Sequence, residues 1–157
     1  MIKNKRGFLL GEETLKIIIA VICIMFLIYF LVAIYFSNAT QKKKVEAENS
    51  LDRISQIIGN PALNQETYEI PNPSGWYLFS FIGQKPNSCI DNCICICDKV
   101  YNIPFRNNLE AQFKECDKNG KCIQVSNIKQ FSEIKITSPP LTDILIKKEN
   151  GIIIEVK

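Results

Sequence analysis

The sequence predicts an α+β fold in which a long N-terminal helix packs on a small antiparallel β-sheet domain. Three observations support this fold class. An uncharged apolar block occupies residues 17–36, an amphipathic stretch follows it directly, and short strand-like segments fill the chain after Pro61. Because antiparallel strands that bury one face against a helix form a stable two-layer domain, the three patterns fit a single structure.

The apolar block predicts a membrane-spanning helix. Residues 17–36 carry no charge, and a helix needs about 20 apolar residues to cross the hydrocarbon core of a bilayer. No second run of comparable length follows, so we expect a single-pass protein. Beyond residue 37 the pattern is amphipathic, and Gly59 and Pro61 stop it. We expect one helix of about 45 residues whose second half buries this stripe: Val45, Ala47, Leu51, Ile54 and Ile58.

The pattern after Pro61 predicts a series of short strands. The aromatic run at residues 75–81 is bounded by Pro73 and Gly83, and we interpret it as core rather than as a ligand-stacking face, since aromatic side chains dominate buried area. The other expected strands are residues 93–97, 121–125 and 134–136, and a terminal hairpin of residues 144–148 and 152–156 around Asn150 and Gly151.

Charge and composition argue against two classes of function. The formal net charge is +3, and Lys3, Lys5 and Arg6 before the apolar block account for all of it. The rest of the chain is neutral, which gives no indication of nucleic-acid binding. Histidine is absent, and we find neither a glycine-rich phosphate loop nor a nucleophile elbow. We therefore expect that the chain has no catalytic site, binds no cofactor and is not an enzyme.

Six of the seven cysteines follow the apolar block, and they predict disulfides. On a strand, Cys93, Cys95 and Cys97 share one face, where neighbours two apart are poorly placed to bond each other. Their partners should lie on adjacent segments. Cys116 and Cys122 flank a predicted turn and could bond each other or each reach the triplet. The full candidate set is Cys89, Cys93, Cys95, Cys97, Cys116 and Cys122, whereas Cys23 lies in the apolar block as a small filler.

A metal or iron–sulfur site is the rival interpretation of these thiols. Zinc sites usually contain paired Cys-x2-Cys knuckles, which this chain lacks, so we prefer disulfides and expect no metal. Crowded thiols persist as disulfides only in an oxidising compartment. This places the C-terminal domain outside the cell membrane and the N-terminus in the cytoplasm. Basic residues do not decide the orientation, because Lys42, Lys43 and Lys44 after the span balance those before it.

The first residues carry a further pattern. A short basic leader ends at Gly7, Phe8 follows, and the carboxylate of Glu12 stands at the fifth position counted from Phe8. This pattern resembles the class III signal of type IV prepilins over about the first thirty residues. The resemblance implies that a prepilin-type peptidase cuts between Gly7 and Phe8. It also implies that Glu12 acts in assembly by pairing with a terminal amine. Glu13 and Lys16 depart from the family pattern and leave open an uncut signal anchor.

We accordingly divide the chain into a leader (1–7), a membrane-spanning region (8–36), an amphipathic extension (37–60) and an extracytoplasmic, disulfide-stapled, β-rich domain (61–157). The resemblance implies a type IV pilin-like subunit of an extracellular filament, with membrane lipid and pilin-like subunits, including copies of itself, as partners. Two alternatives are an anchored extracellular binding module that does not polymerise and an anchored thiol redox or metal protein. Asn38 begins a glycosylation sequon of a kind that often arises by chance.

Overall fold

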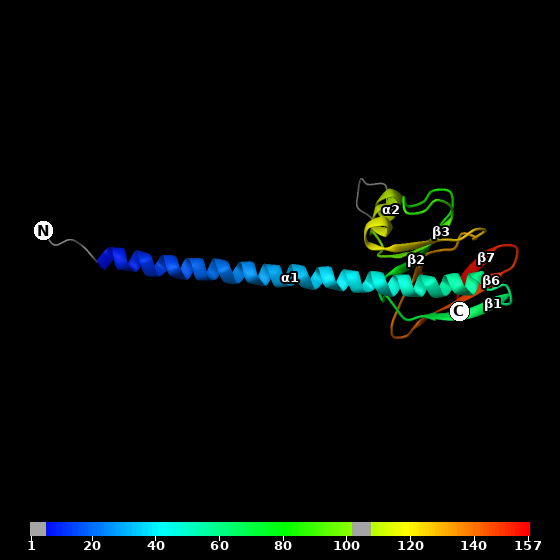
Figure 1. Cartoon of the computed structure of the whole chain (residues 1–157), viewed down its shortest axis with the longest axis horizontal. Helices are drawn as coiled ribbons and strands as arrows, with labels where there is room; N and C mark the ends of the chain where they lie inside the picture. The colour runs from blue at the N-terminus through cyan, green and yellow to red at the C-terminus, as the bar shows by residue number, and fades with distance from the viewer. Residues whose placement is uncertain (1–5, 102–107) are drawn as a thin grey trace. The chain divides into compact units, whose positions relative to one another are not determined.

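The computed structural model describes residues 6–101 and 108–157, with side chains from residue 13 onward. It contains the expected N-terminal helix, α1 (Arg6–Gly59), which has 54 residues and is longer than the sequence pattern indicated (Figure 1). The chain divides into two compact units, Met1–Ala39 and Thr40–Lys157, so the boundary falls inside α1. We call Thr40–Lys157 the C-terminal unit.

The strands of the C-terminal unit form two antiparallel sheets instead of one. The first has the order β1-β6-β7 and the second the order β4-β3-β2-β5. Two elements were not anticipated from the sequence: β1 and the helix α2, which occupies part of a stretch without any readable motif. The strand and helix bounds are β1 Gln65–Ile70, β2 Tyr77–Phe81, β3 Cys93–Cys97, α2 Asn108–Asn119, β4 Lys121–Gln124, β5 Ile134–Lys135, β6 Thr142–Lys148 and β7 Ile152–Val156.

The terminal hairpin confirms its sequence signal. β6 and β7 pair with Lys148 opposite Ile152, which leaves Glu149, Asn150 and Gly151 in the turn. Asn150 has φ 51° and Gly151 has φ 126°, a left-handed pair that asparagine and glycine tolerate better than other residues. The Asn-Gly sequence therefore decides where the chain reverses.

The C-terminal part of α1 forms the centre of the main hydrophobic core. Its buried apolar residues are Ala47, Leu51, Ile54 and Ile57, which follow one another at intervals of three or four and so share one helix face. The predicted stripe was wrong at one end, because the Val45 side chain is 56% exposed. Ser50 also lies on the buried face, where its hydroxyl donates to the Asn72 carbonyl at 2.8 Å.

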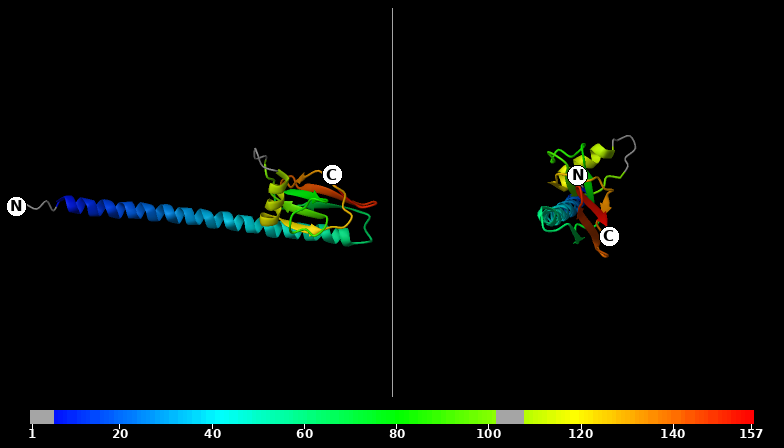
Figure 2. Two further views of the ribbon diagram at one scale, coloured as in Figure 1. Left: turned by 90° about the horizontal axis from the view of Figure 1, so that it is seen from above. Right: turned by 90° about the vertical axis from the view of Figure 1, so that its right-hand side faces the viewer.

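Both sheets contribute to this core. The four-stranded sheet presents Leu78, Ile94 and Ile96 to the α1 side, and buried Trp76 confirms that the aromatic run belongs to the core. Its other face carries Phe79, Phe81 and the cysteines of β3, and this cluster also contains Cys116 of α2. Figure 2 shows α2 and the strands from two further directions. Thus β3 separates two hydrophobic clusters, with isoleucines on one face and cysteines on the other. The three-stranded sheet adds Ile70, Ile144, Ile146 and Ile154 to the α1 cluster.

Leu51→Ala is expected to lower the free energy of unfolding of the C-terminal unit by about 2–5 kcal/mol, because Leu51 is 1% exposed and its truncation leaves a cavity. Val45→Ala is the matched control on the same helix and should change that free energy by less than about 0.5 kcal/mol. Denaturant unfolding of the full chain in detergent micelles, followed by fluorescence of Trp76, the only tryptophan, measures both. Equal effects of the two substitutions would contradict the assignment of the buried face.

Candidate functional site: apolar helix and cysteine cluster

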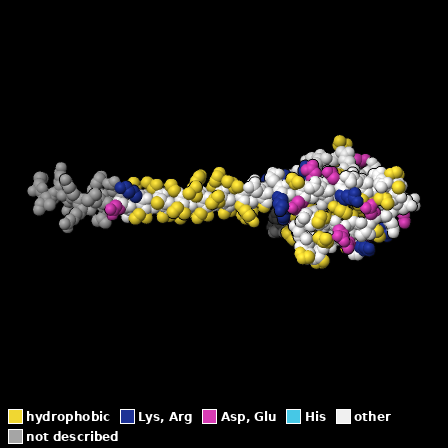
Figure 3. All heavy atoms as spheres, turned by 60° about the horizontal axis from the view of Figure 1, so that its bottom comes forward, with side chains coloured by type: hydrophobic (Ala, Val, Ile, Leu, Met, Phe, Trp, Pro, Cys, Tyr) yellow, Lys and Arg dark blue, Asp and Glu magenta, His cyan; other side chains and the backbone are white. Residues whose placement is uncertain are grey.

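The most exposed apolar surface of the described chain lies on the first half of α1. Every side chain from residue 13 to residue 38 is exposed, and an 18-residue window has a mean hydropathy of 3.3 with no part buried. Figure 3 shows hydrophobic side chains covering the visible face of this stretch. By length and composition this helix can cross a membrane. An apolar surface of this size requires lipid or an apolar protein partner.

Three lysines follow the apolar segment, and each has a contact within the C-terminal unit. Lys42 lies 3.9 Å from the Glu46 carboxylate, and the Lys43 ammonium lies 5.8 Å from the centre of the Trp76 ring. Lys44 donates to the carbonyl of Lys118 at 2.5 Å, near the C-terminal end of α2. A cation is favoured at that end by the helix dipole. Lys43 and Lys44 therefore help to hold their part of α1 against the rest of the C-terminal unit.

The predicted processing and assembly residues fall at the start of α1. The backbones of Gly7, Phe8 and Glu12 are helical, but their side chains lie outside the described residues. The peptidase cut and the pairing of Glu12 therefore stay predictions. Asn38 of the sequon is exposed near the end of the apolar segment.

The six predicted disulfide cysteines form three pairs. They are Cys89–Cys93, Cys95–Cys122 and Cys97–Cys116. The prediction that the triplet on β3 finds its partners on neighbouring segments is confirmed. Two arrangements were left open for Cys116 and Cys122. The structure has the second, in which each of them bonds a cysteine of the triplet. The predicted hairpin turn between them was wrong, because Cys116 lies on α2 and only Cys122 lies on a strand.

Each pair joins a different segment to β3. Cys122 lies directly opposite Cys95 in the β3–β4 register, and Cys116 connects α2 to the end of β3. The junction between α2 and β4 is tight: a Cβ atom on Gly120 would lie 2.5 Å from the Cys97 Cβ, so only glycine fits without a shift. The cysteine cluster is thus built by close approach of α2, β3 and β4.

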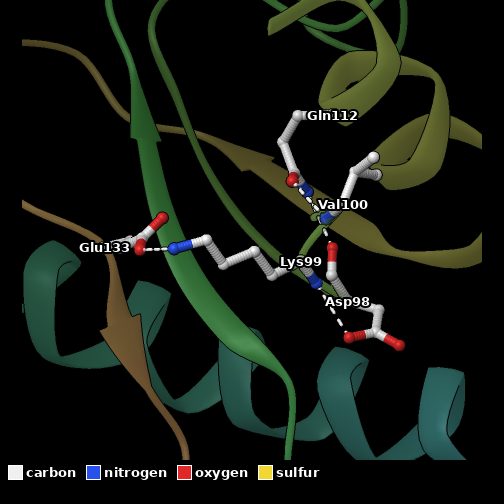
Figure 4. Close-up of polar contacts among 5 residues, drawn as sticks. All are labelled: Asp98, Lys99, Val100, Gln112 and Glu133. Carbon is white, nitrogen blue, oxygen red and sulfur yellow. Dashed lines mark hydrogen bonds and ion pairs between the residues drawn. The ribbon is translucent and has the colours of Figure 1, made fainter. Parts of the chain in front are cut away.

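Gln112 on α2 supports this arrangement from inside. Its side-chain amide donates to the Asp98 carbonyl at 2.7 Å and accepts from the Val100 backbone N–H at 2.8 Å (Figure 4). The same Nε2 atom lies 3.5 Å from the Cys97 sulfur and 3.6 Å from the Cys116 sulfur. Gln112 is buried, and these partners satisfy its polar atoms. No sequence pattern indicated this role for Gln112, because α2 itself was not predicted.

Asp117, also on α2, holds the loop that precedes Cys89. Its two carboxylate oxygens accept the backbone N–H groups of Asn87 and Ser88, both at 2.9 Å. Partial burial, the largest single influence, raises the pKa of Asp117. Hydrogen bonds from Ser88 and Asn87 together outweigh it, so that the pKa lies below its ordinary value of 3.8. The charged form is therefore the one that fits the folded unit.

Asp117→Asn is expected to lower the free energy of unfolding by about 1 kcal/mol at neutral pH, since a charge-assisted pair of hydrogen bonds is weakened. A carboxyl whose pKa is depressed by folding stabilises the fold above its unfolded pKa, and this contribution is lost as the pH falls through the folded pKa. The difference between wild type and variant should be complete above about pH 5 and disappear in stronger acid. Denaturant titrations at several pH values measure it, and a difference independent of pH would contradict the role of the charge.

A groove of about 830 Å³ lies between the aromatic end of β2 and the segment before β5. Phe79, Phe81 and Phe131 line it, together with the ion pair of Lys99 and Glu133 that Figure 4 shows. The hydrogen bond to Glu133 is the main cause that raises the pKa of Lys99. The groove was not foreseen from the sequence because its walls are far apart along the chain.

Ser80 in the groove wall is a structural link between two segments. Its hydroxyl accepts the Phe131 backbone N–H at 3.0 Å and donates to the Phe131 carbonyl at 3.3 Å. The hydroxyl thereby ties β2 to the chain that leads into β5. Its hydrogen-bonding capacity is used within the fold, which makes it a poor candidate for a nucleophile.

The fold and the site define an α+β protein whose N-terminal helix is able to cross a membrane and whose C-terminal unit is linked by disulfides. Comparison of the chain with protein-family models gave no match, and comparisons with curated proteins and with solved structures gave none either. The functional argument therefore depends on the residues themselves.

Proposed function

We propose that this chain is a type IV pilin-like structural subunit of an extracellular filament, anchored in the membrane before assembly. The observation that carries the proposal is α1, one continuous helix whose first half is apolar and exposed and whose second half forms the core of the C-terminal unit. The leader that ends at Gly7, with Phe8 and Glu12 after it, adds the resemblance to prepilins.

Assembly in this proposal is an exchange of apolar environments. The segment of residues 17–36 leaves lipid and packs against copies of itself, so its side chains stay out of water throughout. Packing between helices, rather than the hydrophobic effect, then selects the filament over the bilayer. A carboxylate at the edge of an apolar segment is costly unless it is paired, and after the cut the amine of Phe8 is the partner available to Glu12.

The proposal places the C-terminal unit outside the membrane. Three disulfides join its segments, and disulfides persist in oxidising compartments. A filament subunit exposed to solvent and shear benefits from such links, because they stabilise a small unit beyond what its core supplies.

A second candidate function is a binding module that uses α1 as a tether and does not polymerise. The groove lined by Phe79, Phe81 and Phe131 favours this candidate, since clefts of several hundred Å³ with apolar walls and a few polar groups hold small ligands. The two candidates differ in what happens to the leader, because a tether works equally well with the leader attached.

Intact mass of the protein from its native membrane tests the proposal. Loss of residues 1–7, with Phe8 as the new N-terminus, is the expected result. Gly7→Val should block the cut and retain the leader, and Lys3→Ala, which leaves Gly7 and Phe8 unchanged, is the matched control that is still cut. An intact leader on the wild-type chain, in cells that process other prepilins, would contradict the pilin-like function and favour the tethered binding module.

A further inference from the structure

We propose that Cys89, Cys93, Cys95 and Cys122 form a tetrathiolate zinc site in the reduced chain, before their two disulfides close. The four Sγ atoms all lie within 4.8 Å of one another. Tetrahedral zinc with Zn–S distances of about 2.3 Å places its sulfur ligands about 3.8 Å apart. The Sγ atoms of Cys93 and Cys95, which belong to different disulfides, are already 3.9 Å apart.

The change needed to admit zinc is small. The bonded sulfur atoms of Cys89–Cys93 and Cys95–Cys122 must separate from an ordinary S–S bond length of about 2 Å to ligand spacing, a movement of somewhat less than about 2 Å in each pair. Rotation of the cysteine side chains can supply this movement once the S–S bonds are open. The backbone of β3 and β4 can keep its register.

Strand geometry explains why four ligands meet without Cys-x2-Cys knuckles. Cys93 and Cys95 point to the same face of β3, Cys122 stands opposite Cys95 on β4, and Cys89 returns from the preceding loop. Pairing of two strands thus replaces the knuckle that the sequence lacks. Cys89, Cys93 and Cys95 are buried and Cys122 is partly exposed, so the ion has a protected site with an entrance on the β4 side.

The third disulfide pair provides an internal reference. Cys97 and Cys116 do not belong to the four-sulfur group, and Gln112 donates toward both of their sulfur atoms. Zinc binding should therefore depend on Cys93 and Cys122 but not on Cys97 or Cys116. This distinction separates a defined site from non-specific binding by a cysteine-rich chain.

Zinc and the two disulfides are alternative states of one cluster. To leave the zinc state, the four thiolates lose four electrons in total and form two S–S bonds, and Zn²⁺ is released. Two equivalents of a disulfide oxidant accept these electrons together with four protons from the solvent and become four thiol groups. Because zinc gathers these four sulfur atoms, it would also disfavour the arrangements in which one of the four bonds Cys97 or Cys116.

The test uses the full chain in detergent micelles, fully reduced and titrated with Zn²⁺, with Co²⁺ as a spectroscopic probe. We expect one zinc per chain and, with Co²⁺, the absorption of a tetrahedral tetrathiolate site. Cys122→Ser and Cys93→Ser should each weaken zinc binding at least about tenfold. Loss of a residue that only hydrogen-bonds a metal ligand already lowers metal affinity by about that factor, and here a ligand itself is lost. The double variant Cys97→Ser/Cys116→Ser is the matched control and should bind zinc like the wild type. Oxidised glutathione should release the ion.

The zinc titration of the wild-type chain tests the proposal even if a variant fails to fold. Absence of stoichiometric zinc in the reduced wild-type chain, or a Co²⁺ spectrum without tetrathiolate bands, would overturn the proposal. Equal zinc affinity in the Cys93, Cys122 and Cys97/Cys116 variants would overturn it as well, because it would show binding by any available thiols. None of these outcomes depends on filament formation.

Discussion

Replacing Cys95, Cys97, Cys116 and Cys122 together with serine is expected to lower the free energy of unfolding of the oxidised C-terminal unit by about 6 kcal/mol. The two disulfides close stretches of 27 and 19 residues in sequence separation, and cross-links of this length restrict the unfolded chain strongly. A domain of this size is typically stable by about 5–15 kcal/mol, so the fourfold variant should be marginal.

The two pairs are nested, and this predicts a particular pattern among the double variants. Because Cys97–Cys116 lies inside the loop that Cys95–Cys122 closes, removing either pair alone leaves the other to restrain the same segment. The free energy of unfolding of each double variant should therefore fall by only about 2–3 kcal/mol, the value expected from the entropy of the unfolded chain. Unfolding in denaturant, followed by Trp76 fluorescence, measures all three variants. Cys23→Ser, at the free cysteine of α1, is the control and should leave the unfolding free energy unchanged.

Two results would contradict this prediction. If the fourfold variant unfolded at the same denaturant concentration as the wild type, the disulfides would be dispensable and the hydrophobic core alone would hold the unit. If the loss were confined to one pair, the nested-loop argument would be wrong, and the effect of that pair would have to come from contacts in the folded state.

Glu12→Gln is expected to reduce filament yield at least about tenfold, on the proposal that the chain is a pilin-like subunit. An uncharged amide cannot pair with the amine of Phe8, and each 1.4 kcal/mol lost from a subunit contact lowers an equilibrium constant about tenfold. Electron microscopy and immunoblotting of the sheared cell-surface fraction measure the yield. The amount of subunit in the membrane should stay the same, because Glu12 precedes the apolar block.

Glu13→Gln is the matched control, since it removes the same charge one position further along. Glu13 is rotated by about a quarter of a helical turn from Glu12 around the helix axis, so its carboxylate would point away from the amine of the new N-terminus. Equal losses of filament in the two variants would show that net charge at the helix start matters and that the position does not. An undiminished yield in Glu12→Gln would remove the assembly role inferred from the prepilin resemblance.

Local patterns predicted much of the fold. The alternation of cysteine and isoleucine at residues 93–97 predicted a strand with two different faces, and β3 separates an isoleucine cluster from a cysteine cluster. The Asn150-Gly151 turn and the position of the helix stop were also read correctly. These features depend on backbone preferences and side-chain periodicity within a few residues, which the sequence states directly.

Other features were not predicted correctly. Val45 lies two residues before Ala47 and therefore about 160° away around the helix, so it points away from the face of α1 that the strands contact, and it is exposed. The sequence also did not indicate α2 or β1. The residues of α2 are mostly polar, and the helix is buried through Gln112 and Cys116 rather than through a regular apolar stripe.

By itself the sequence determined a helix able to span a membrane, a second amphipathic half that must find a core, and six cysteines after the span. Only the tertiary structure decided which cysteines pair, that two sheets share one core with α1, and that a groove opens between β2 and the segment before β5. The physical reason is the range of the interactions. Helix length and strand alternation arise from neighbours along the chain, whereas pairing of Cys97 with Cys116 requires α2 to pack against β3, and that contact exists only once the core has formed.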